Sequence, residues 1–261
     1  MLSLGASSRG RGQRAPMQID YFRKPTPHAT ISELVPPEVY AKIRFPDIPP
    51  RPMGRIGRDI YFGEPEWAPL MATPGWAEFS SHFMSEAFVL RLVGMFADDI
   101  RAGGCGIDPA KVYLAQRAES RVETESGLLS ETDDPHALFV RFDLQAIDAT
   151  YNKKVHCDHL RRIIGGVLFM TSAEDEELEG GEFALYSDLA FNNDRKCHQP
   201  RLEKTFAFRH NHGVVFLNSN AGFHGPTPIR RMTGMRKWVY YAISSRRNVW
   251  QVAPQRQSVV A

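Results

Sequence analysis

The chain has 261 residues, of which 43% are hydrophobic and 24% are charged, a composition typical of a globular protein with one large or two small domains. Its formal net charge of +2 is too small to favour nucleic acid as the main partner, so we expect a small molecule or a protein segment instead. Three scattered cysteines, Cys105, Cys157 and Cys197, predict neither a disulfide framework nor a thiolate zinc site, and they favour a reducing compartment.

Residues 1–16 lack the apolar run that a secretory signal requires. Their Gly, Ser and Arg content predicts a disordered N-terminal segment, and Met17 is an alternative to Met1 as the natural start. No stretch of the sequence approaches the roughly 18 consecutive apolar residues of a membrane-spanning helix. We therefore expect a cytoplasmic protein without a membrane partner.

Residues 17–136 predict a helical and irregular region that supports the rest of the chain. Residues 30–75 are rich in proline, which favours one short helix followed by irregular chain. Residues 85–104 predict a longer helix, with Ser85 as its N-cap, Gly103 at its end and apolar residues at helical spacing between them.

From Ala137 onward the hydrophobic pattern changes to the alternation that is typical of β-strands. After residues 138–145, further strand-like runs follow, which read IIGGVLFM, GGEFALYS, KTFAFR, GVVFLN and KWVYYAIS. Short strands separated by turns over residues 137–245 predict a sandwich or a barrel, and residues 246–261 are left as a C-terminal tail.

A candidate metal motif lies between two of these strands. His156 and Asp158 are two residues apart, so on an extended segment their side chains point to the same side and could bind one ion. The composition makes about one such pair expected by chance, and a surface histidine paired with Asp158 is an equally good interpretation. A third ligand is needed, and His224, which follows an apolar strand and a Gly-containing turn, is the candidate.

Two imidazoles and one carboxylate on one face of an ion leave open positions that suit non-heme Fe(II) and oxygen chemistry. A bidentate 2-oxo acid can take two of these positions, and a buried arginine about a dozen residues beyond the second histidine can bind its far carboxylate. Arg236 is twelve residues beyond His224.

These motifs resemble one enzyme family. The motifs are HCD at 156–158, IIGGVLFM, EGGEFALYS at 179–187, GVVFLN, FHG ending at 225 and GMRKW at 234–238. In this order and spacing, over roughly residues 137–245, the chain resembles the 2-oxoglutarate and Fe(II)-dependent oxygenases, in particular the prolyl 4-hydroxylase-like group.

The resemblance implies an α+β fold, with a double-stranded β-helix (jelly roll) core over residues 137–245 and supporting N-terminal helices within a single domain, 17–261. It implies iron bound by His156, Asp158 and His224, and 2-oxoglutarate bound by the metal and Arg236. Dioxygen is the other cosubstrate, and ascorbate is a candidate stimulant. Tyr151 is a loose counterpart of a tyrosine that leads more directly into the first histidine in the family.

The activity that the resemblance implies is hydroxylation of an unactivated C–H bond, with formation of succinate and CO2. Desaturation, epimerisation and ring formation stay open. We expect a small molecule such as an amino acid or a natural-product intermediate, with a peptidyl substrate as the alternative, and a monomer or homodimer. The candidate substrate residues are Arg141, Asp143, Gln145 and Tyr151, of which the first three share the polar face of one strand.

Two other functions use the same residues. A zinc-dependent hydrolase or isomerase on a jelly roll would need a general base near the metal, and no glutamate stands beside His156 or His224. A non-catalytic binding module with a vestigial site is the other alternative, although all three candidate ligands are present.

Some neighbouring residues allow two interpretations. His210 and His212 form a rival pair that we expect in a surface turn without a nearby carboxylate. The basic residues that flank the motif, Lys153, Lys154, Arg161 and Arg162, are expected to form a solvated rim, or else to attract an anionic substrate. The alternation after residue 235 puts Arg236 on the inner face of its strand, but the opposite register would offer Lys237 instead.

Overall fold

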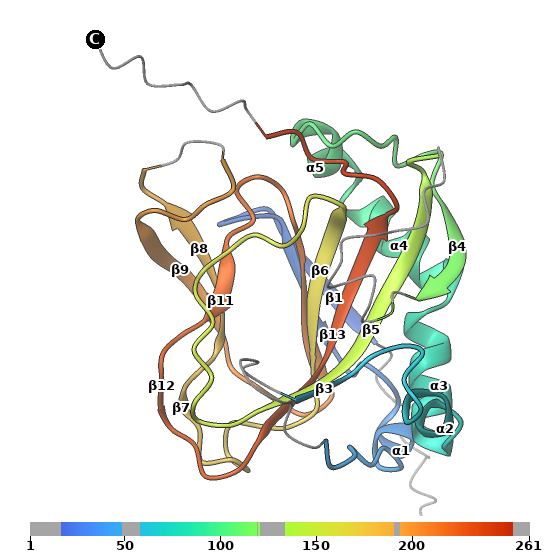
Figure 1. Ribbon diagram of the computed structural model, residues 1–261, viewed down its shortest axis with the longest axis vertical. Helices are drawn as coiled ribbons and strands as arrows, with labels where there is room; N and C mark the ends of the chain where they lie inside the picture. The colour runs from blue at the N-terminus through green and yellow to red at the C-terminus, as the bar shows by residue number, and fades with distance from the viewer. Residues whose placement is uncertain (1–16, 49–57, 119, 121–133, 191–193, 253–261) are drawn as a thin grey trace, which may run out of the picture.

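The computed structural model describes residues 17–48, 58–118, 120, 134–190 and 194–252. The predicted disordered segment, 1–16, lies outside the described residues. Eight strands form a large sheet in the order β1-β2-β10-β6-β13-β5-β3, and β4 pairs with β5 (Figure 1). The strands of this sheet are β1 Gln18–Phe22, β2 His28–Ser32, β3 Arg58–Ile60, β4 Tyr113–Ala118, β5 Ala137–Ile147, β6 Arg162–Phe169, β10 His212–Leu217 and β13 Arg236–Ser245.

Two smaller sheets complete the β-structure. One has the order β11-β8-β9 and the other pairs β12 with β7. Their strands are β7 Glu179–Gly180, β8 Phe183–Asp188, β9 Pro200–Phe206, β11 His224–Pro226 and β12 Ile229–Arg231. An apolar cluster joins the three-stranded sheet to the large sheet, with Phe183 and Leu185 on one side and Val167, Phe169 and Phe216 on the other. The protein is therefore a mixed α+β structure with two facing sheets, which is consistent with a jelly roll.

Five helices among the described residues precede most of the sheet, and the long ones cover its outer face (Figure 1). They are α1 Pro37–Tyr40, α2 Trp67–Met71, α3 Pro74–Phe83, α4 Glu86–Met95 and α5 Ala97–Ala102. The ring of Phe79 on α3 lies 5.9 Å from that of Phe142 on β5, and the hydroxyl of Tyr241 on β13 donates a 3.0 Å hydrogen bond to the carbonyl of Phe83. Within the described part of the chain, every helix is too short or too polar to cross a bilayer.

The helix predicted over residues 85–104 is present in two parts. Ser85 is its N-cap, as predicted, and its hydroxyl accepts a 3.2 Å hydrogen bond from the amide of Phe88. The helix is interrupted at Phe96, whose backbone leaves the helical region at φ −93° and ψ 4°. The ring of Phe96 is fully buried against Tyr21 of β1, at 5.1 Å between centroids, so tertiary packing accompanies the break.

The prediction that residues 17–136 are helical and irregular missed four strands. Strands β1 to β4 lie in this region, and all join the large sheet. Each has only three to six residues, and pairing with neighbouring strands decides their conformation. The predicted C-terminal tail also begins with core residues, because Val249 and Trp250 are buried and the indole of Trp250 donates a 2.6 Å hydrogen bond to the carbonyl of Arg162. Residues 253–261 lie outside the described residues.

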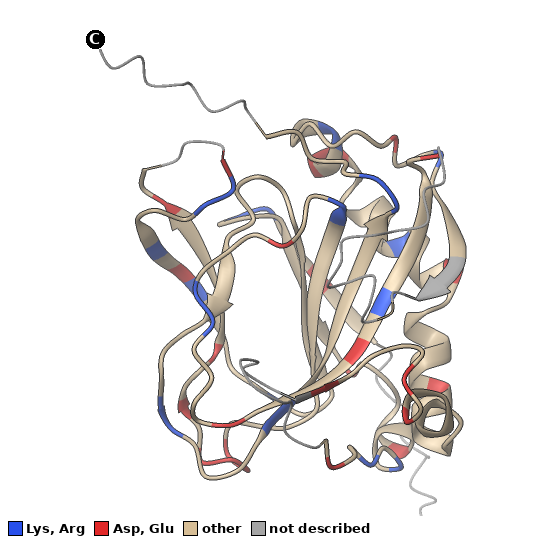
Figure 2. Ribbon diagram, in the orientation of Figure 1, with Lys and Arg blue, Asp and Glu red and all other residues tan. Residues whose placement is uncertain are grey.

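Strand β13 has two different faces. Val239, Tyr241 and Ile243 belong to the core under the helices, whereas Arg236 and Trp238 point to the side of the smaller sheets, where they line a pocket. Figure 2 shows that charged residues are few along the central strands β6 and β13 and occur mainly at their ends. The sheet therefore has a helix-covered apolar face and a second face on which a few polar side chains are placed.

We predict that Phe79→Ala lowers the free energy of unfolding by about 3–5 kcal/mol, because it removes a fully buried ring between α3 and β5. Urea unfolding followed by circular dichroism measures the change. The matched control is Leu189→Ala, at a side chain that is 61% exposed, and it should change the free energy by about 0.5 kcal/mol or less. Equal effects of the two changes would contradict this packing.

Candidate metal centre and adjoining pocket

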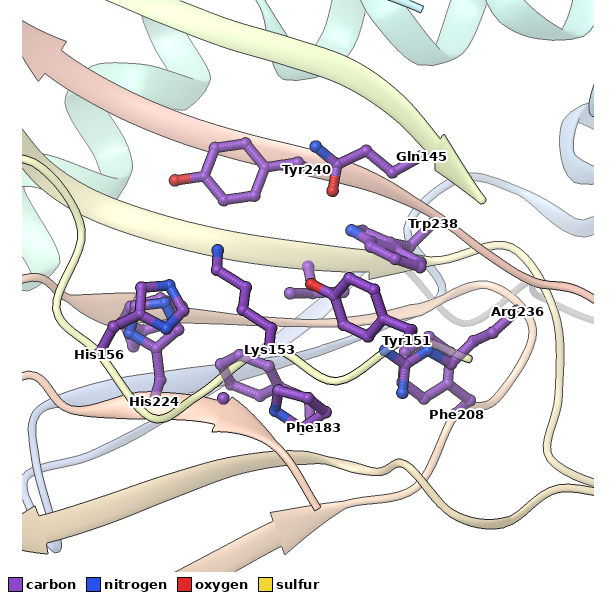
Figure 3. A pocket seen from close by; sticks show the side chains of 14 residues that line it. Gln145, Tyr151, Lys153, His156, Phe183, Phe208, His224, Arg236, Trp238 and Tyr240 are labelled. Carbon is purple, nitrogen blue, oxygen red and sulfur yellow. The ribbon is translucent and has the colours of Figure 1, made fainter. Parts of the chain in front are cut away.

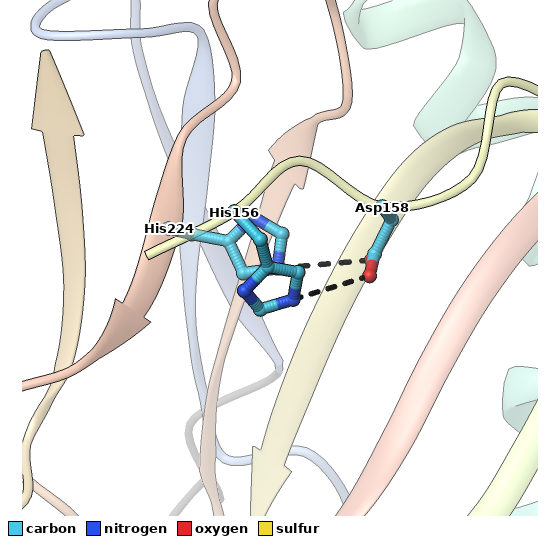
Figure 4. A group of neighbouring side chains, drawn as sticks. All are labelled: His156, Asp158 and His224. Atoms are coloured by element: carbon cyan, nitrogen blue, oxygen red, sulfur yellow. Dashed lines mark ion pairs between the residues drawn. The ribbon is translucent and has the colours of Figure 1, made fainter. Parts of the chain in front are cut away.

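The structure brings His156, Asp158 and His224 together from two separate segments (Figure 4). His156 and Asp158 lie in the loop between β5 and β6, and His224 begins β11. The Nε2 atom of His156 is 3.6 Å from Oδ1 of Asp158, and Nε2 of His224 is 3.7 Å from Oδ2 of the same carboxylate. All three ligand atoms lie within 4.8 Å of one another, so one cation between them can contact all three.

Backbone pairing fixes the two histidines side by side. The amide of His156 donates to the carbonyl of His224 at 3.0 Å, and the amide of His224 donates to the carbonyl of His156 at 2.9 Å. This isolated antiparallel bridge places the two imidazole centroids 4.4 Å apart.

Each imidazole is oriented by its other ring nitrogen. Nδ1 of His156 lies 2.8 Å from the carbonyl of Lys154, and Nδ1 of His224 lies 3.0 Å from the carbonyl of Gly222. A carbonyl only accepts, so both Nδ1 atoms carry the hydrogen and both Nε2 atoms present a lone pair toward Asp158. Nε2 of His156 is buried and has no hydrogen-bond partner among the described residues. An orphaned buried lone pair beside a carboxylate fits a metal ion.

Three side chains position Asp158. Its Oδ2 atom accepts a 2.6 Å hydrogen bond from the hydroxyl of Tyr240, its amide donates to Oδ1 of Asn218 at 2.9 Å, and its carbonyl accepts from Arg195 at 2.6 Å. Gly165 on β6 leaves room beside it, because a Cβ there would lie 3.3 Å from Oδ2 of Asp158. The ring of Phe216 is closer still, at 2.6 Å from such a Cβ. A side chain at position 165 would therefore crowd this corner of the site.

The electrostatics of the cluster favour the forms that bind a cation. Burial by itself would raise the pKa of Asp158, but the adjacent His224 and His156, together with Lys153, hold that pKa well below its usual range. Burial, and then the neighbouring His156, lower the pKa of His224 to about 3. The carboxylate is therefore ionised and the His224 imidazole neutral at neutral pH, which are the protonation states that metal ligands need.

A pocket extends from the two histidines along the inner face of β13. Figure 3 shows His156 and His224 at one end of this pocket and Arg236 at the other, with Lys153 and Tyr151 between them. Its walls include the aromatic side chains of Phe183, Phe208, Phe216, Trp238 and Tyr240. The pocket thus joins the candidate metal site to a buried cation.

Arg236 is only 4% exposed, and its Nε and Nη1 atoms have no hydrogen-bond partner among the described residues. Its guanidinium lies 4.5 Å from the ring centroid of Phe208, 5.1 Å from that of Trp238 and 5.8 Å from that of Tyr151. Burial lowers its pKa to about 10, so it is charged at neutral pH. A buried cation with unsatisfied donors is costly unless a ligand supplies an anion.

The structure settles the register left open for β13. Arg236, Trp238 and Tyr240 line the pocket, whereas the side chain of Lys237 is not among the pocket-lining residues. Alternation along the strand puts the side chain of Lys237 on the same face as Val239 and Tyr241, which belong to the core under the helices.

The structure places the four candidate substrate residues near one another. Gln145 and Tyr151 line the pocket. Arg141 and Asp143 are buried and form an ion pair, and Arg141 also donates a 2.6 Å hydrogen bond to the hydroxyl of Tyr61. The guanidinium of Arg141 lies 4.5 Å from the ring centroid of Tyr240. The polar face of β5 therefore faces the site and not bulk water, and the role of these residues in substrate binding stays a prediction.

Two predictions about neighbouring residues are wrong. His210 does lie in a turn, but Asp175 contacts its Nε2 and the hydroxyl of Tyr40 lies 3.1 Å from its Nδ1. We expected no carboxylate near His210, but Asp175 lies beside it on a loop that is distant in sequence. Arg161 and Arg162 are each 2% exposed, so they are not part of a solvated rim. Arg162 begins β6 and donates a 2.8 Å hydrogen bond to the hydroxyl of Ser244 on β13.

Several residues that contact Asp158 were not predicted from the sequence, because no sequence motif marks them. Asn218 and Arg195 act on Asp158 through loops that follow β10 and β8, and only the fold brings these loops together. Tyr240 carried a usable signal, since alternation from Arg236 puts it on the same face of β13.

No protein-family model matches the chain, and no curated protein matches it. Similar solved structures include an oxidoreductase of the 2OG-Fe(II) oxygenase family from Burkholderia pseudomallei, at 20% identity and a TM-score of 0.30 over 44% of this chain and 50% of that one. A Pseudomonas putida prolyl-4-hydroxylase is similar at 13% identity and a TM-score of 0.29, over 41% of this chain and 49% of that one. This chain thus covers about half the length of each of these two proteins.

A further similar structure is a prolyl hydroxylase from Trichoplax adhaerens in complex with a peptide fragment of the hypoxia inducible factor oxygen degradation domain. Its identity is 10% and its TM-score 0.42, over 84% of this chain and 83% of that one. These proteins carry the names of the group that the sequence motifs resemble. Since every one of these TM-scores is below 0.5, we argue the function from the site itself.

We predict that His156→Ala, Asp158→Ala and His224→Ala each abolish stoichiometric Fe(II) binding in anaerobic equilibrium dialysis, because each removes one of three converging ligands. Cooperative thermal unfolding should persist in His156→Ala, whose side chain lies in a loop. The control combines His210→Ala with His212→Ala and should bind Fe(II) normally. If only that control lost Fe(II) binding, the metal site would have to be reassigned to His210 and His212.

We also predict that Tyr240→Phe weakens Fe(II) binding by about 10- to 100-fold, because Asp158 loses the hydroxyl that orients its Oδ2. The aromatic ring and its packing remain, so the thermal midpoint should change little. Tyr186→Phe is the matched control, since that hydroxyl donates to the carbonyl of Pro226 and not to any of the three candidate ligands. Unchanged metal affinity in Tyr240→Phe would show that the hydroxyl has no part in positioning the carboxylate.

Proposed function

We propose that the protein is an Fe(II)- and 2-oxoglutarate-dependent dioxygenase that hydroxylates a C–H bond of a small molecule. One observation carries the proposal: two imidazoles and a carboxylate converge at one end of a pocket whose other end holds a buried, unsatisfied arginine. The two facing sheets that hold these groups are, in this proposal, the halves of a double-stranded β-helix.

Each part of the proposed site has its own residues. His156, Asp158 and His224 would hold Fe(II) on one face and leave the remaining positions for a 2-oxo acid and dioxygen. When bound, iron and 2-oxoglutarate supply the oxidising chemistry, with succinate and CO2 as by-products. Arg236 would bind the far carboxylate of 2-oxoglutarate in a two-pronged contact, and the rings of Phe208 and Trp238 would keep water away from that ion pair.

The nature of the pocket disfavours the zinc-hydrolase alternative. Such an enzyme needs a general base beside the metal-bound water. Among the described residues that line the pocket there is no aspartate or glutamate, and the nearby Asp158 is itself one of the three candidate ligands. A hydrolase would also give no reason to bury Arg236 at the far end.

The proposal is tested first by the absorption spectrum of the anaerobic protein. A 2-oxo acid bound through two oxygens to Fe(II) gives a weak metal-to-ligand charge-transfer band, which zinc does not give. We expect this band on adding Fe(II) and 2-oxoglutarate to the wild-type protein, and not in Asp158→Ala. In air the complex should form succinate, and an oxygen atom from heavy-isotope dioxygen should enter the product. Absence of the band together with solvent-derived oxygen in a product would support the hydrolase instead.

For the cosubstrate, we predict that Arg236→Gln weakens 2-oxoglutarate binding on the order of 30- to several thousand-fold, which corresponds to about 2–5 kcal/mol for a buried charge that loses its partner. Fe(II) binding should survive. Arg236→Lys should be intermediate, because it keeps the charge and loses the planar fork. Titration of the charge-transfer band with 2-oxoglutarate measures the affinity.

The matched control for this prediction is Lys237→Gln, one residue along β13 and outside the pocket lining. It should leave the affinity for 2-oxoglutarate within about twofold of wild type, because the side chain is on the other face of the strand. A large effect of Lys237→Gln and none of Arg236→Gln would overturn the placement of the cosubstrate.

A further inference from the structure

A second hollow adjoins the pocket beside the candidate metal site. The two share four lining residues, Gln145, Tyr151, Lys153 and Trp238. The outer hollow is otherwise mostly polar, and its lining includes Asp59, Tyr61, Arg141, Asn152 and Lys154. Lys153 and Gln145 therefore lie at the boundary between the two hollows.

Lys153 is a cation without a hydrogen bond or ion pair to any residue that the structure describes. Its side chain rises from the loop before His156 and points across the pocket toward the large sheet (Figure 3). It is accessible from the hollow, yet protein surrounds it closely enough that burial lowers its pKa. Asp158 is the carboxylate that favours its charge, and Arg141 opposes it.

The other cations near this junction differ from Lys153. Lys154 lines only the outer hollow, whereas Lys153 lines both hollows. Arg141 is paired with Asp143 and donates to Tyr61, so the fold already satisfies it. Arg236 lies at the opposite end of the pocket, where it is assigned to the cosubstrate. Once Asp158 is committed to a metal ion, Asp59 is the one carboxylate left among the described residues that line either hollow, and it forms no ion pair with Lys153.

Gln145 adds a second unsatisfied group at the same place. The side-chain amide of Gln145 makes no hydrogen bond to any described residue, and the residue lines both hollows. One ammonium and one neutral amide match a singly charged planar anion such as a carboxylate. A phosphate dianion matches these two groups less well, because together they supply one positive charge.

We propose that the substrate is a small molecule with a free carboxylate, which Lys153 binds with the help of the Gln145 amide so that a C–H bond of the molecule faces the metal site. This inference rests on the proposed function and adds the class of substrate. An extended peptide that offers only amides to Lys153 does not meet this requirement.

The probes are free amino acids and hydroxy acids, each paired with its own primary amide. Binding is measured by ligand-observed nuclear magnetic resonance on the zinc-substituted protein saturated with 2-oxoglutarate, which cannot turn over. We expect acids to bind wild type at least about tenfold tighter than their amides, because only the acid compensates Lys153. Lys153→Met should remove this preference, and Lys153→Arg should keep most of it.

Lys237→Met is the matched control, because Lys237 lines neither hollow, and it should retain the preference for acids. The affinity of each variant for 2-oxoglutarate is measured in parallel with Fe(II), through the charge-transfer band. Lys153→Met should bind 2-oxoglutarate within about twofold of wild type, whereas Arg236→Gln should not.

Four results would overturn the proposal while leaving the oxygenase function in place. Acids and amides could bind wild type equally, the preference for acids could persist in Lys153→Met, or Lys153→Met could weaken 2-oxoglutarate instead, which would make Lys153 part of the cosubstrate site. Binding confined to peptides without a free carboxylate would equally exclude a small acid. Failure of the proposed function is a separate outcome, because wild type would then show no charge-transfer band with Fe(II) and 2-oxoglutarate.

Discussion

The candidate site depends on the backbone bridge between His156 and His224. These residues belong to segments about seventy positions apart, and two reciprocal amide-to-carbonyl hydrogen bonds of 3.0 and 2.9 Å hold them side by side. The loop that contains His156 leads directly into β6 of the large sheet, while His224 starts a strand of the smaller sheet. The three candidate ligands are therefore held where the large sheet and the smaller sheet meet, so the fold sets their spacing.

The two faces of strand β13 have different roles, one in the apolar core and the other in the pocket. One face supplies Val239, Tyr241 and Ile243 to the helix-covered core. The other face carries Arg236, Trp238 and Tyr240 into the pocket, where a buried guanidinium lowers stability in the absence of an anion. A one-residue shift in register would exchange the two faces, so the apolar core also specifies where the arginine points.

The sequence predicted the parts of the fold and site that have a short-range pattern. Strand-like runs after residue 137 located β5, β6, β8, β9, β10 and β13, but not the strands of two or three residues, β7, β11 and β12. The spacing of His156, Asp158 and His224 marked the cluster that the structure assembles, and Ser85 marked a helix start. The four early strands were missed, because pairing with strands distant in sequence defines their conformation more than their own residue pattern does.

Partners that are distant in sequence limited the prediction of individual charged residues. Arg162 was assigned to a solvated rim from its charge alone, yet Ser244 on β13 accepts a hydrogen bond from its buried guanidinium. His210 received Asp175 as a neighbour from another loop in the same way. Local sequence records that a residue is charged, and only the fold determines whether its charge is compensated.

The polar groups around the pocket fall into two sets, those with hydrogen-bond partners within the protein and those without. Arg141 and the backbone of Asp158 have partners within the protein, which fixes their positions. Nε2 of His156, the guanidinium of Arg236 and the ammonium of Lys153 lack hydrogen bonds to described residues, although they surround one pocket. Nε2 of His156 and the guanidinium of Arg236 are buried, so leaving them unsatisfied opposes folding, whereas Lys153 is exposed to solvent. Unsatisfied groups of complementary chemistry around one pocket are hard to explain as accidents of packing. The lone pair of His156 matches a metal ion, and the cations of Arg236 and Lys153 each match an anion. The arrangement of these groups therefore supports a proposed site that binds three ligands together.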